Sequence, residues 1–267
     1  MDGDTRLRLR VLGELAATRD GVVVDLGGRR QRAVLAALIV MRDQVVPADR
    51  LADCVWGEVA PANTTGAIQA YVSHLRRRLQ PEAGARQRDG VIASTGAGYV
   101  LRLGPDTVDA WCFERAVDAA AGMPPAEAVR ALDDALRLWR GPPYAEYAGE
   151  SWVEPETVRL TELRAVARER LLEARLQQGD AALLVGGLEA LVADDPLREE
   201  RWRLLVLALY RSQRQADALS ALRRARTNLA EELGVDPGPA LRRLEADVLA
   251  QSPALDAPPP PVTATPA

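Results

Sequence analysis

Residues 64–80 read TTGAIQAYVSHLRRRLQ, a pattern that predicts one amphipathic helix. Successive residues of a helix lie about 100° apart, so a single stripe of this segment is apolar and must pack inward. That stripe consists of Ile68, Tyr71, Val72, Leu75 and Leu79. Asn63 or Thr64 can cap the first amides through a side-chain oxygen. We therefore expect a helix with one buried face from about Thr64 to Gln80.

The opposite face of this helix is small, polar and basic. It consists of Gly66, Ala70, Ser73 and Arg77, flanked by Gln69 and Arg76 on one edge and by His74 on the other. Small residues let a helix backbone sit deep in a groove, and the polar side chains offer donors to base edges. No carboxylate occurs in the intervals 59–81 and 90–105, so a phosphate backbone would meet no repulsion there. The face predicts contact with nucleic acid, although an arginine run alone more often marks a solvated surface.

The residues on either side of this helix predict a small winged module. Alternating apolar residues from Leu7 to Val11 and the strand Val22–Val24, which follows an Asp20-Gly21 turn, predict an antiparallel sheet. Helical patterns follow at 29–41 and from Pro47 to about residue 54.

A β-hairpin is expected over residues 91–103, with Gly96 and Gly98 at the bend. The order of sheet, three helices and glycine-rich hairpin is that of a winged helix-turn-helix domain. We expect this domain to cover residues 1–103.

The second half of the chain is acidic and helical. Residues 1–103 carry 15 Arg and 11 acidic residues, whereas residues 104–267 carry 19 Arg and 27 acidic residues; the chain contains no Lys. Apolar residues recur at helical spacing in six windows, at 126–139, 158–177, 181–193, 200–211, 215–232 and 239–251. A weak internal repeat of tetratricopeptide length predicts an all-α domain of stacked helical hairpins over residues 104–251. The proline-rich residues 252–267 are expected to form a disordered tail. The fold class is therefore mainly α with a small β part.

Composition excludes several classes of protein. The 267 residues are 48% hydrophobic and 27% charged, as in a globular protein with about two domain cores. Two Cys and one His exclude a disulfide framework, a zinc finger and a histidine-centred catalytic site, so we expect no enzyme, no metal and no cofactor. No apolar run reaches the ~20 residues of a membrane-spanning helix, and we expect a cytoplasmic protein without a membrane partner.

Short motifs in both halves resemble one family of regulators. Similarity to the OmpR/PhoB-type winged helices rests on Trp56-Gly57, Ala70-Tyr71-Val72-Ser73-His74-Leu75-Arg76-Arg77-Arg78-Leu79 and Gly96-Ala97-Gly98-Tyr99. The second half is similar to the bacterial transcriptional activator domain through Arg198-Glu199-Glu200-Arg201-Trp202, Ala208-Leu209-Tyr210, Gln215-Ala216-Asp217-Ala218-Leu219 and Glu231-Glu232-Leu233-Gly234-Val235-Asp236-Pro237. Both halves in this order resemble the SARP group, the Streptomyces antibiotic regulatory proteins and their actinobacterial relatives, over about residues 7–250.

The resemblance implies roles for particular residues. The base-reading helix face falls on Gln69, Ser73, His74, Arg76 and Arg77, and the wing falls on Ser94, Thr95 and Gly96. Phosphate contacts are implied for Arg29, Arg30, Gln31, Thr64 and Thr65, which also lie near helix N-termini that attract anions. Many wings of this type carry an arginine where this chain has Thr95, which argues against insertion of a cation into the minor groove at that point.

The resemblance also implies partners and a function. These are double-stranded promoter DNA read as direct repeats, RNA polymerase through its σ and α subunits, and a second copy of the chain, as a homodimer on DNA. The implied function is a transcriptional activator of a secondary-metabolite (antibiotic) gene cluster. The alternative is a helical scaffold or signal-binding module that binds DNA only loosely, because stacked helical hairpins usually bind protein.

Overall fold

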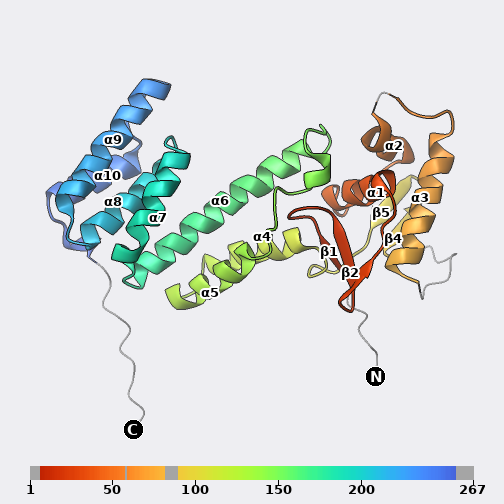
Figure 1. The fold of residues 1–267 in the computed structure, drawn as a ribbon, viewed down its shortest axis with the longest axis horizontal. Helices are drawn as coiled ribbons and strands as arrows, with labels where there is room; N and C mark the ends of the chain where they lie inside the picture. Colours follow the sequence, from red (N-terminus) through yellow and green to blue (C-terminus); the bar gives the residue numbers. More distant parts are fainter. Residues whose placement is uncertain (1–6, 58, 82–89, 257–267) are drawn as a thin grey trace, which may run out of the picture. The chain divides into compact units, whose positions relative to one another are not determined.

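The computed structural model describes residues 7–57, 59–81 and 90–256 (Figure 1). The chain divides into two compact units. The first unit comprises Met1–Asp118 and Ala135–Arg164, and the second comprises Ala119–Asp134 and Ala165–Ala267. The chain passes from the first unit to the second after residue 118, returns to the first at residue 135, and enters the second again at residue 165. This division differs from the domain boundary expected after residue 103, which stays a prediction.

The first unit begins with a three-stranded antiparallel sheet in the order β1-β2-β3. Its strands are β1 (Leu7–Arg10), β2 (Ala16–Arg19) and β3 (Val22–Val24). Asp20 and Gly21 join β2 to β3 with φ angles of 51° and 81°. Two consecutive positive φ angles characterise the tight turn whose twist matches that of the strands it joins. The predicted sheet and turn are confirmed.

Three helices and a hairpin follow, as the sequence predicts. The helices are α1 (Arg29–Val40), α2 (Ala48–Trp56) and α3 (Thr64–Leu79), and the hairpin pairs β4 (Ile92–Thr95) with β5 (Gly98–Leu101). Residues 33–39 of α1 are all buried, so α1 forms the centre of the core against which α2 and α3 pack. The family's arrangement of a third helix beside a wing is therefore present.

Helix α4 (Asp109–Ala120) is an element that the sequence analysis did not predict. Its first residue, Asp109, is 8% exposed and joins three segments of the first unit. The Asp109 carboxylate accepts hydrogen bonds from the amides of Val11 at 2.8 Å and Leu12 at 3.4 Å, and it pairs with Arg140 Nη2 at 2.6 Å. Burial raises the pKa of Asp109 above its ordinary value, an effect that the hydrogen bond from Arg140 opposes.

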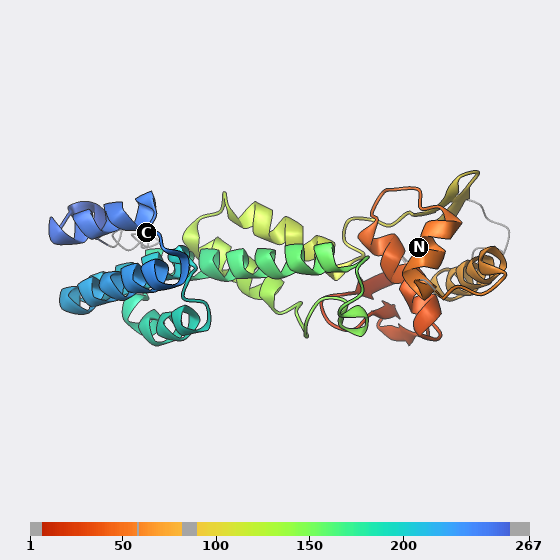
Figure 2. The same cartoon turned by 90° about the horizontal axis from the view of Figure 1, so that it is seen from above.

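The second unit consists of helices joined by short turns, with no strand among its described residues. It contains most of α5 (Pro125–Leu136), the last part of α6 (Glu154–Gln177), and α7 (Ala181–Asp194), α8 (Glu199–Arg211), α9 (Gln215–Leu233) and α10 (Pro239–Leu249). These helices confirm the six helical windows, with ends that differ by up to four residues. Figure 2 shows the same helices from above.

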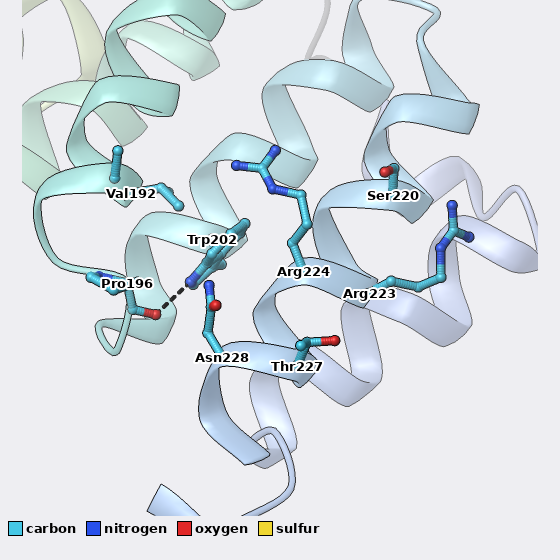
Figure 3. Close-up of a pocket in the computed structure, with 9 residues that line it drawn as sticks. Val192, Pro196, Trp202, Ser220, Arg223, Arg224, Thr227 and Asn228 are labelled. Atoms are coloured by element: carbon cyan, nitrogen blue, oxygen red, sulfur yellow. Dashed lines mark hydrogen bonds between the residues drawn. The ribbon is translucent and has the colours of Figure 1, made fainter. Parts of the chain in front are cut away.

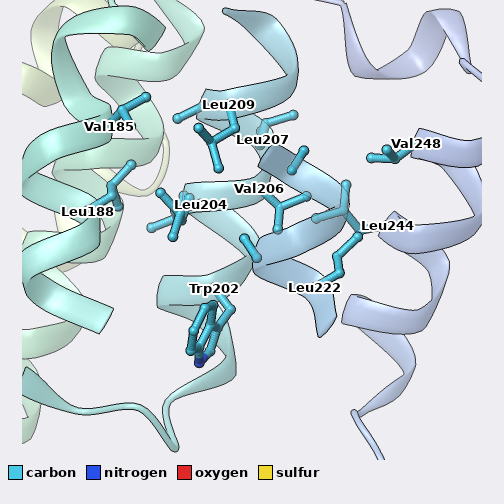
Figure 4. Packing of buried hydrophobic residues seen from close by; sticks show 14 of the residues in the cluster. Val185, Leu188, Trp202, Leu204, Val206, Leu207, Leu209, Leu222, Leu244 and Val248 are labelled. Atoms are coloured by element: carbon cyan, nitrogen blue, oxygen red, sulfur yellow. The ribbon is translucent and has the colours of Figure 1, made fainter. Parts of the chain in front are cut away.

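Helix α8 is the centre of this unit's core. Trp202 and residues 204–209 are buried, because α8 packs against α7 on one side and α9 on another (Figure 4). The core continues to Leu255 in a short 3-10 turn (Pro253–Leu255), so ordered structure extends into the expected tail. Residues 257–267 of that tail lie outside the described residues. Among the described helices, none is long and apolar enough to cross a membrane.

Removing the Asp109 carboxylate should destabilise the first unit. In Asp109→Ala, two buried amides and the Arg140 guanidinium lose their acceptor, and we expect the free energy of unfolding to fall by about 2–4 kcal/mol. Urea denaturation measures this change. Asp118→Ala is the matched control, because Asp118 is exposed on the same helix, and it should change stability by less than about 0.5 kcal/mol. Equal effects of the two substitutions would contradict the role given to Asp109.

Candidate nucleic-acid interface

Helix α3 is fixed in rotation by its buried side. Ile68, Val72, Leu75 and Leu79 are buried, as the helical stripe predicts. Half-buried Tyr71 stacks on Trp56 of α2, with ring centroids 5.9 Å apart and planes inclined by 27°. The helix begins with a side-chain cap, in which Asn63 Oδ1 accepts from the Gly66 amide at 2.9 Å. The cap confirms one of the two predicted capping residues.

The outward side of α3, which we call the recognition face, consists of Thr65, Gln69, Ala70, Ser73 and Arg77. All five residues are exposed. No hydrogen bond or ion pair to another described residue engages the side chains of Gln69, Ser73 or Arg77. These side chains are therefore free to bind a ligand. Gln69, Ser73 and Arg77 lie together as the sequence predicts, and their base-reading roles stay predictions.

Arg76 lies at the junction between α3 and the hairpin. Its guanidinium donates to the carbonyl of Ile92 from Nε and to Ser94 Oγ from Nη2, each at 2.7 Å. Both Arg76 and Ser94 are half-buried. In this arrangement they hold β4 beside α3, so the base-reading role of Arg76 and the wing contact of Ser94 stay predictions.

His74 is set apart from the recognition face. It is half-buried, and its Nε2 atom is shielded from solvent without a hydrogen-bond partner among the described residues. A Cβ placed on Gly27 would lie 3.0 Å from this atom, so the imidazole lies against the turn before α1. The base-reading role expected for His74 stays a prediction.

The wing is a tight hairpin with an exposed tip. Thr95 and Gly96 are exposed there, and Thr95 Oγ1 donates to the carbonyl of Gly98 and accepts from the amide of Ala97, each at 3.3 Å. The base of the hairpin is tied to Val46, whose backbone exchanges two hydrogen bonds with Tyr99 at 2.7 and 2.9 Å.

Gly98 is required by this close approach. Its φ angle is 152°, and a Cβ added there would lie 2.2 Å from the Val46 carbonyl oxygen. No other residue type fits without moving the backbone.

The residues expected to contact phosphate differ in availability. Arg30 is exposed, with its guanidinium 5.9 Å from the centre of the Trp56 ring, and Thr65 is exposed on the first turn of α3, whereas Thr64 is half-buried. Gln31 accepts the Gly28 amide at 2.6 Å and so closes the start of α1.

Arg29 is paired within the protein. Its Nη2 lies 3.1 Å from Glu150 Oε1, and its guanidinium lies 5.7 Å from the centre of the Tyr147 ring. Sequence reasoning missed this pair, because 121 residues separate its members and no local pattern indicates such a contact.

Arg19 is a second residue that the sequence analysis missed. Its guanidinium donates to the carbonyls of Arg78, at 3.2 Å, and Leu79. These carbonyls belong to the last turn of α3, where a cation is favoured by the helix dipole. Arg78 itself lies 3.5 Å from Asp25, the carboxylate that approaches this end of the helix. The recognition face therefore ends at Arg77, before the turn that Arg19 and Asp25 contact.

Two protein families match this chain. The family described as "Transcriptional regulatory protein, C terminal" matches residues 23–101, and the bacterial transcriptional activator domain matches residues 108–249. The first match covers the three helices and the hairpin, and the second covers most of the helical half.

Curated relatives and a solved structure agree with these families. The transcriptional regulatory protein EmbR of Mycobacterium tuberculosis is 40% identical over 95% of this chain and 66% of its own length. The transcriptional regulator RedD of Streptomyces coelicolor is 34% identical over 94% of this chain and 73% of its own. The structure of Mycobacterium tuberculosis EmbR in complex with a low-affinity phosphopeptide matches with a TM-score of 0.84 and 39% identity, over 93% of this chain and 66% of that one. The chain thus spans just under two thirds of the length of EmbR.

Replacing Gly98 should disturb the wing. In Gly98→Ala the added methyl group overlaps the Val46 carbonyl, and we expect the free energy of unfolding to fall by about 1–3 kcal/mol. Thermal or urea denaturation measures this. Gly96→Ala is the control from the same hairpin, because a Cβ there meets nothing within 4 Å, and it should be nearly neutral. Equal stability of Gly98→Ala and Gly96→Ala would contradict the close approach of Gly98 to the Val46 carbonyl.

Proposed function

The chain belongs to the SARP family of transcriptional regulators, and from this premise we propose that it is an activator that reads promoter DNA with the recognition face of α3. The observation that carries the proposal is a solvent-exposed helix face with free Gln69, Ser73 and Arg77 side chains, beside a hairpin. Glutamine pairs with adenine and arginine with guanine through two hydrogen bonds each in the major groove. Ala70 at the centre of the face leaves room for close approach to the base edges.

We assign the other predicted residues by what their side chains already contact. The groups that bind DNA phosphates are Arg30, Thr65 and the backbone amides at the start of α3. The wing tip, at Thr95 and Gly96, contacts the sugar-phosphate backbone of the DNA next to the groove. Arg76 acts as a positioning residue, because its bonds to Ile92 and Ser94 set the distance between helix and wing. A phosphate must compete with the Glu150 carboxylate for the Arg29 guanidinium, so we expect Arg29 to contribute less to DNA binding than Arg30.

The finer parts of the proposal concern the operator and the partners. Two copies of the chain bind direct repeats as a homodimer on DNA, and the helical half contacts the σ and α subunits of RNA polymerase. The regulated genes form a secondary-metabolite cluster, as the family's name implies. Support for these points comes from membership of the family. Transcription in vitro from a repeat-containing promoter, with and without the protein, tests recruitment of RNA polymerase: we expect more transcript with the protein.

Footprinting and gel-shift titration test DNA reading directly. We expect the protein to protect a repeated sequence in a promoter of its own gene cluster and to bind that fragment at least 100-fold tighter than a scrambled fragment of equal length. Equal affinity for the two fragments would contradict sequence-specific reading and would favour the loosely binding helical scaffold.

Arg77 should carry a large share of the specificity. We expect Arg77→Ala to weaken binding to the specific site by about 1–3 kcal/mol, roughly 5- to 150-fold, through loss of one base contact. Binding to scrambled DNA should change far less. Arg242→Ala is the control, because Arg242 is an exposed arginine of α10 in the second unit and its loss changes the net charge equally. If both variants lost the same affinity, Arg77 would contribute charge alone.

Arg30 should behave as a phosphate contact instead. We expect Arg30→Ala to weaken binding to the specific fragment and to the scrambled fragment by a similar factor, because phosphates carry no sequence information. The slope of log affinity against log salt should become shallower by about 1, since one fewer counterion is released. Gel shifts at several salt concentrations measure the slope. An unchanged slope would remove Arg30 from the interface.

A further inference from the structure

The last turn of α3 contains Arg77 and has no glycine cap. The last four carbonyls of a helix have no partner within the helix, and a glycine in the left-handed conformation commonly closes such an end. Here the next residue is Gln80, whose φ angle is −148° and whose amide donates to the Arg76 carbonyl at 2.8 Å. That bond does not reach the later carbonyls of Arg78 and Leu79. Helix ends without such a cap fray, so this turn needs another partner.

Arg19 of β2 is that partner. Its Nη2 atom donates to the carbonyl of Arg78 at 3.2 Å and to the carbonyl of Leu79, 60 residues away in the sequence. The guanidinium keeps its charge at any pH that the fold tolerates, and the helix dipole favours a cation at this end. Arg19 therefore stabilises the last turn of α3 through hydrogen bonds and through its charge.

The strand that carries Arg19 is held on both of its edges. β2 is the central strand of the sheet, and Arg19 is paired with Leu7 of β1 and with Val22 of β3. Ala17, two residues earlier on β2, is buried, so the strand is also attached to the core. Arg19 itself is half-buried. The sheet thus gives the C-terminal end of α3 a rigid anchor.

The ion pair at the same end of α3 is a weaker constraint. The Arg78 guanidinium lies 3.5 Å from the Asp25 carboxylate, and the two side chains are 50% and 68% exposed. Exposed pairs of this kind contribute little to stability, because water and salt screen them. Arg19 is therefore the stronger of the two contacts that hold this turn.

Arg19 also differs from arginines that bind only side chains. Arg224 of α9, for example, reaches over the Trp202 ring, as Figure 3 shows, and pairs with the Glu189 carboxylate at 2.9 Å. A pair of this kind joins two side chains, each of which can change rotamer. A hydrogen bond to a backbone carbonyl constrains the helix itself, so loss of the Arg19 guanidinium acts directly on the last turn of α3.

We propose that Arg19 is a positioning residue for DNA reading, which keeps Arg77 in helical geometry and so fixes the direction of its side chain. The proposal rests on the proposed function, in which Arg77 contacts a base. Arg77 directly precedes the two residues whose carbonyls Arg19 binds, so opening of the last turn would also release Arg77. A side chain that is positioned before binding loses less entropy on DNA, so Arg19 increases specific affinity without touching DNA.

Amide hydrogen exchange of the free full chain tests the anchor without DNA. Arg19→Met removes the donors but keeps an apolar stem of similar length. We expect the amides of residues 78–80 to exchange at least about fivefold faster, while those of residues 68–75 keep their rates, because only the last turn opens. Arg10→Met is the matched control, since Arg10 is exposed on β1 of the same sheet, and it should change none of these rates. Unchanged exchange in Arg19→Met, or faster exchange along the whole of α3, would overturn the proposal.

Gel-shift titration tests the effect on DNA reading. We expect Arg19→Met to weaken binding to the specific fragment about five- to tenfold, and binding to the scrambled fragment less than about twofold, because one base contact loses its fixed position. In the Arg77→Ala background Arg19→Met should weaken specific binding less than about twofold, because the side chain that it positions is already absent. Arg19→Lys should restore most of the lost affinity, since an ammonium group also binds carbonyls at a helix C-terminus.

The two experiments separate this proposal from the proposed function. Equal losses from Arg19→Met with and without the Arg77 side chain would overturn the positioning role. Equal binding of both fragments by the wild-type chain would instead contradict sequence-specific reading, and the exchange rates would still decide whether Arg19 anchors α3.

Discussion

Burial of one stripe of α3 is the constraint on which the DNA-reading surface depends. Burial of Ile68, Val72, Leu75 and Leu79 contributes about 1.5–3 kcal/mol for each side chain. Turning the helix by one residue, about 100°, would expose that stripe and bury polar side chains, at a cost of several kcal/mol for a guanidinium without a partner. The core therefore determines which residues form the recognition face, and no contact with DNA is needed to orient them.

The hairpin extends this constraint to a second element. Arg76 holds β4 through two hydrogen bonds, and the backbone of Tyr99 in β5 pairs with Val46 just before α2. Because Gly98 allows the strand to approach Val46 without a steric clash, the hairpin is attached on both of its strands. Its tip is thereby held at a fixed distance from α3, which a protein that contacts a groove and the adjacent backbone together requires.

The sequence predicts most helices and strands correctly, but it does not predict which side chains contact one another. Periodicity located α3 and its buried stripe, because a helical pattern depends only on neighbouring residues. The same pattern put His74 and Arg76 at the edges of the exposed face, where a rotation of a few tens of degrees separates a free side chain from an occupied one. Arg76 finds its partners 16 and 18 residues later, and His74 faces Gly27. Helix α4 was missed because its role rests on Asp109 contacting Val11 from 98 residues away.

Pairing with carboxylates determines which arginines are available to a ligand. In the acid-rich second unit many arginines are engaged by carboxylates; Arg203, for example, contacts Glu173 and Glu200. Arg223 has no carboxylate partner among the described residues, as Arg77 has none in the first unit, so neither charge is compensated within the protein. Their surroundings determine what each can bind. Arg77 projects from the recognition face, an exposed helix face that a long polyanion can reach, beside a hairpin held at a fixed distance, whereas Arg223 is exposed on α9 of the second unit.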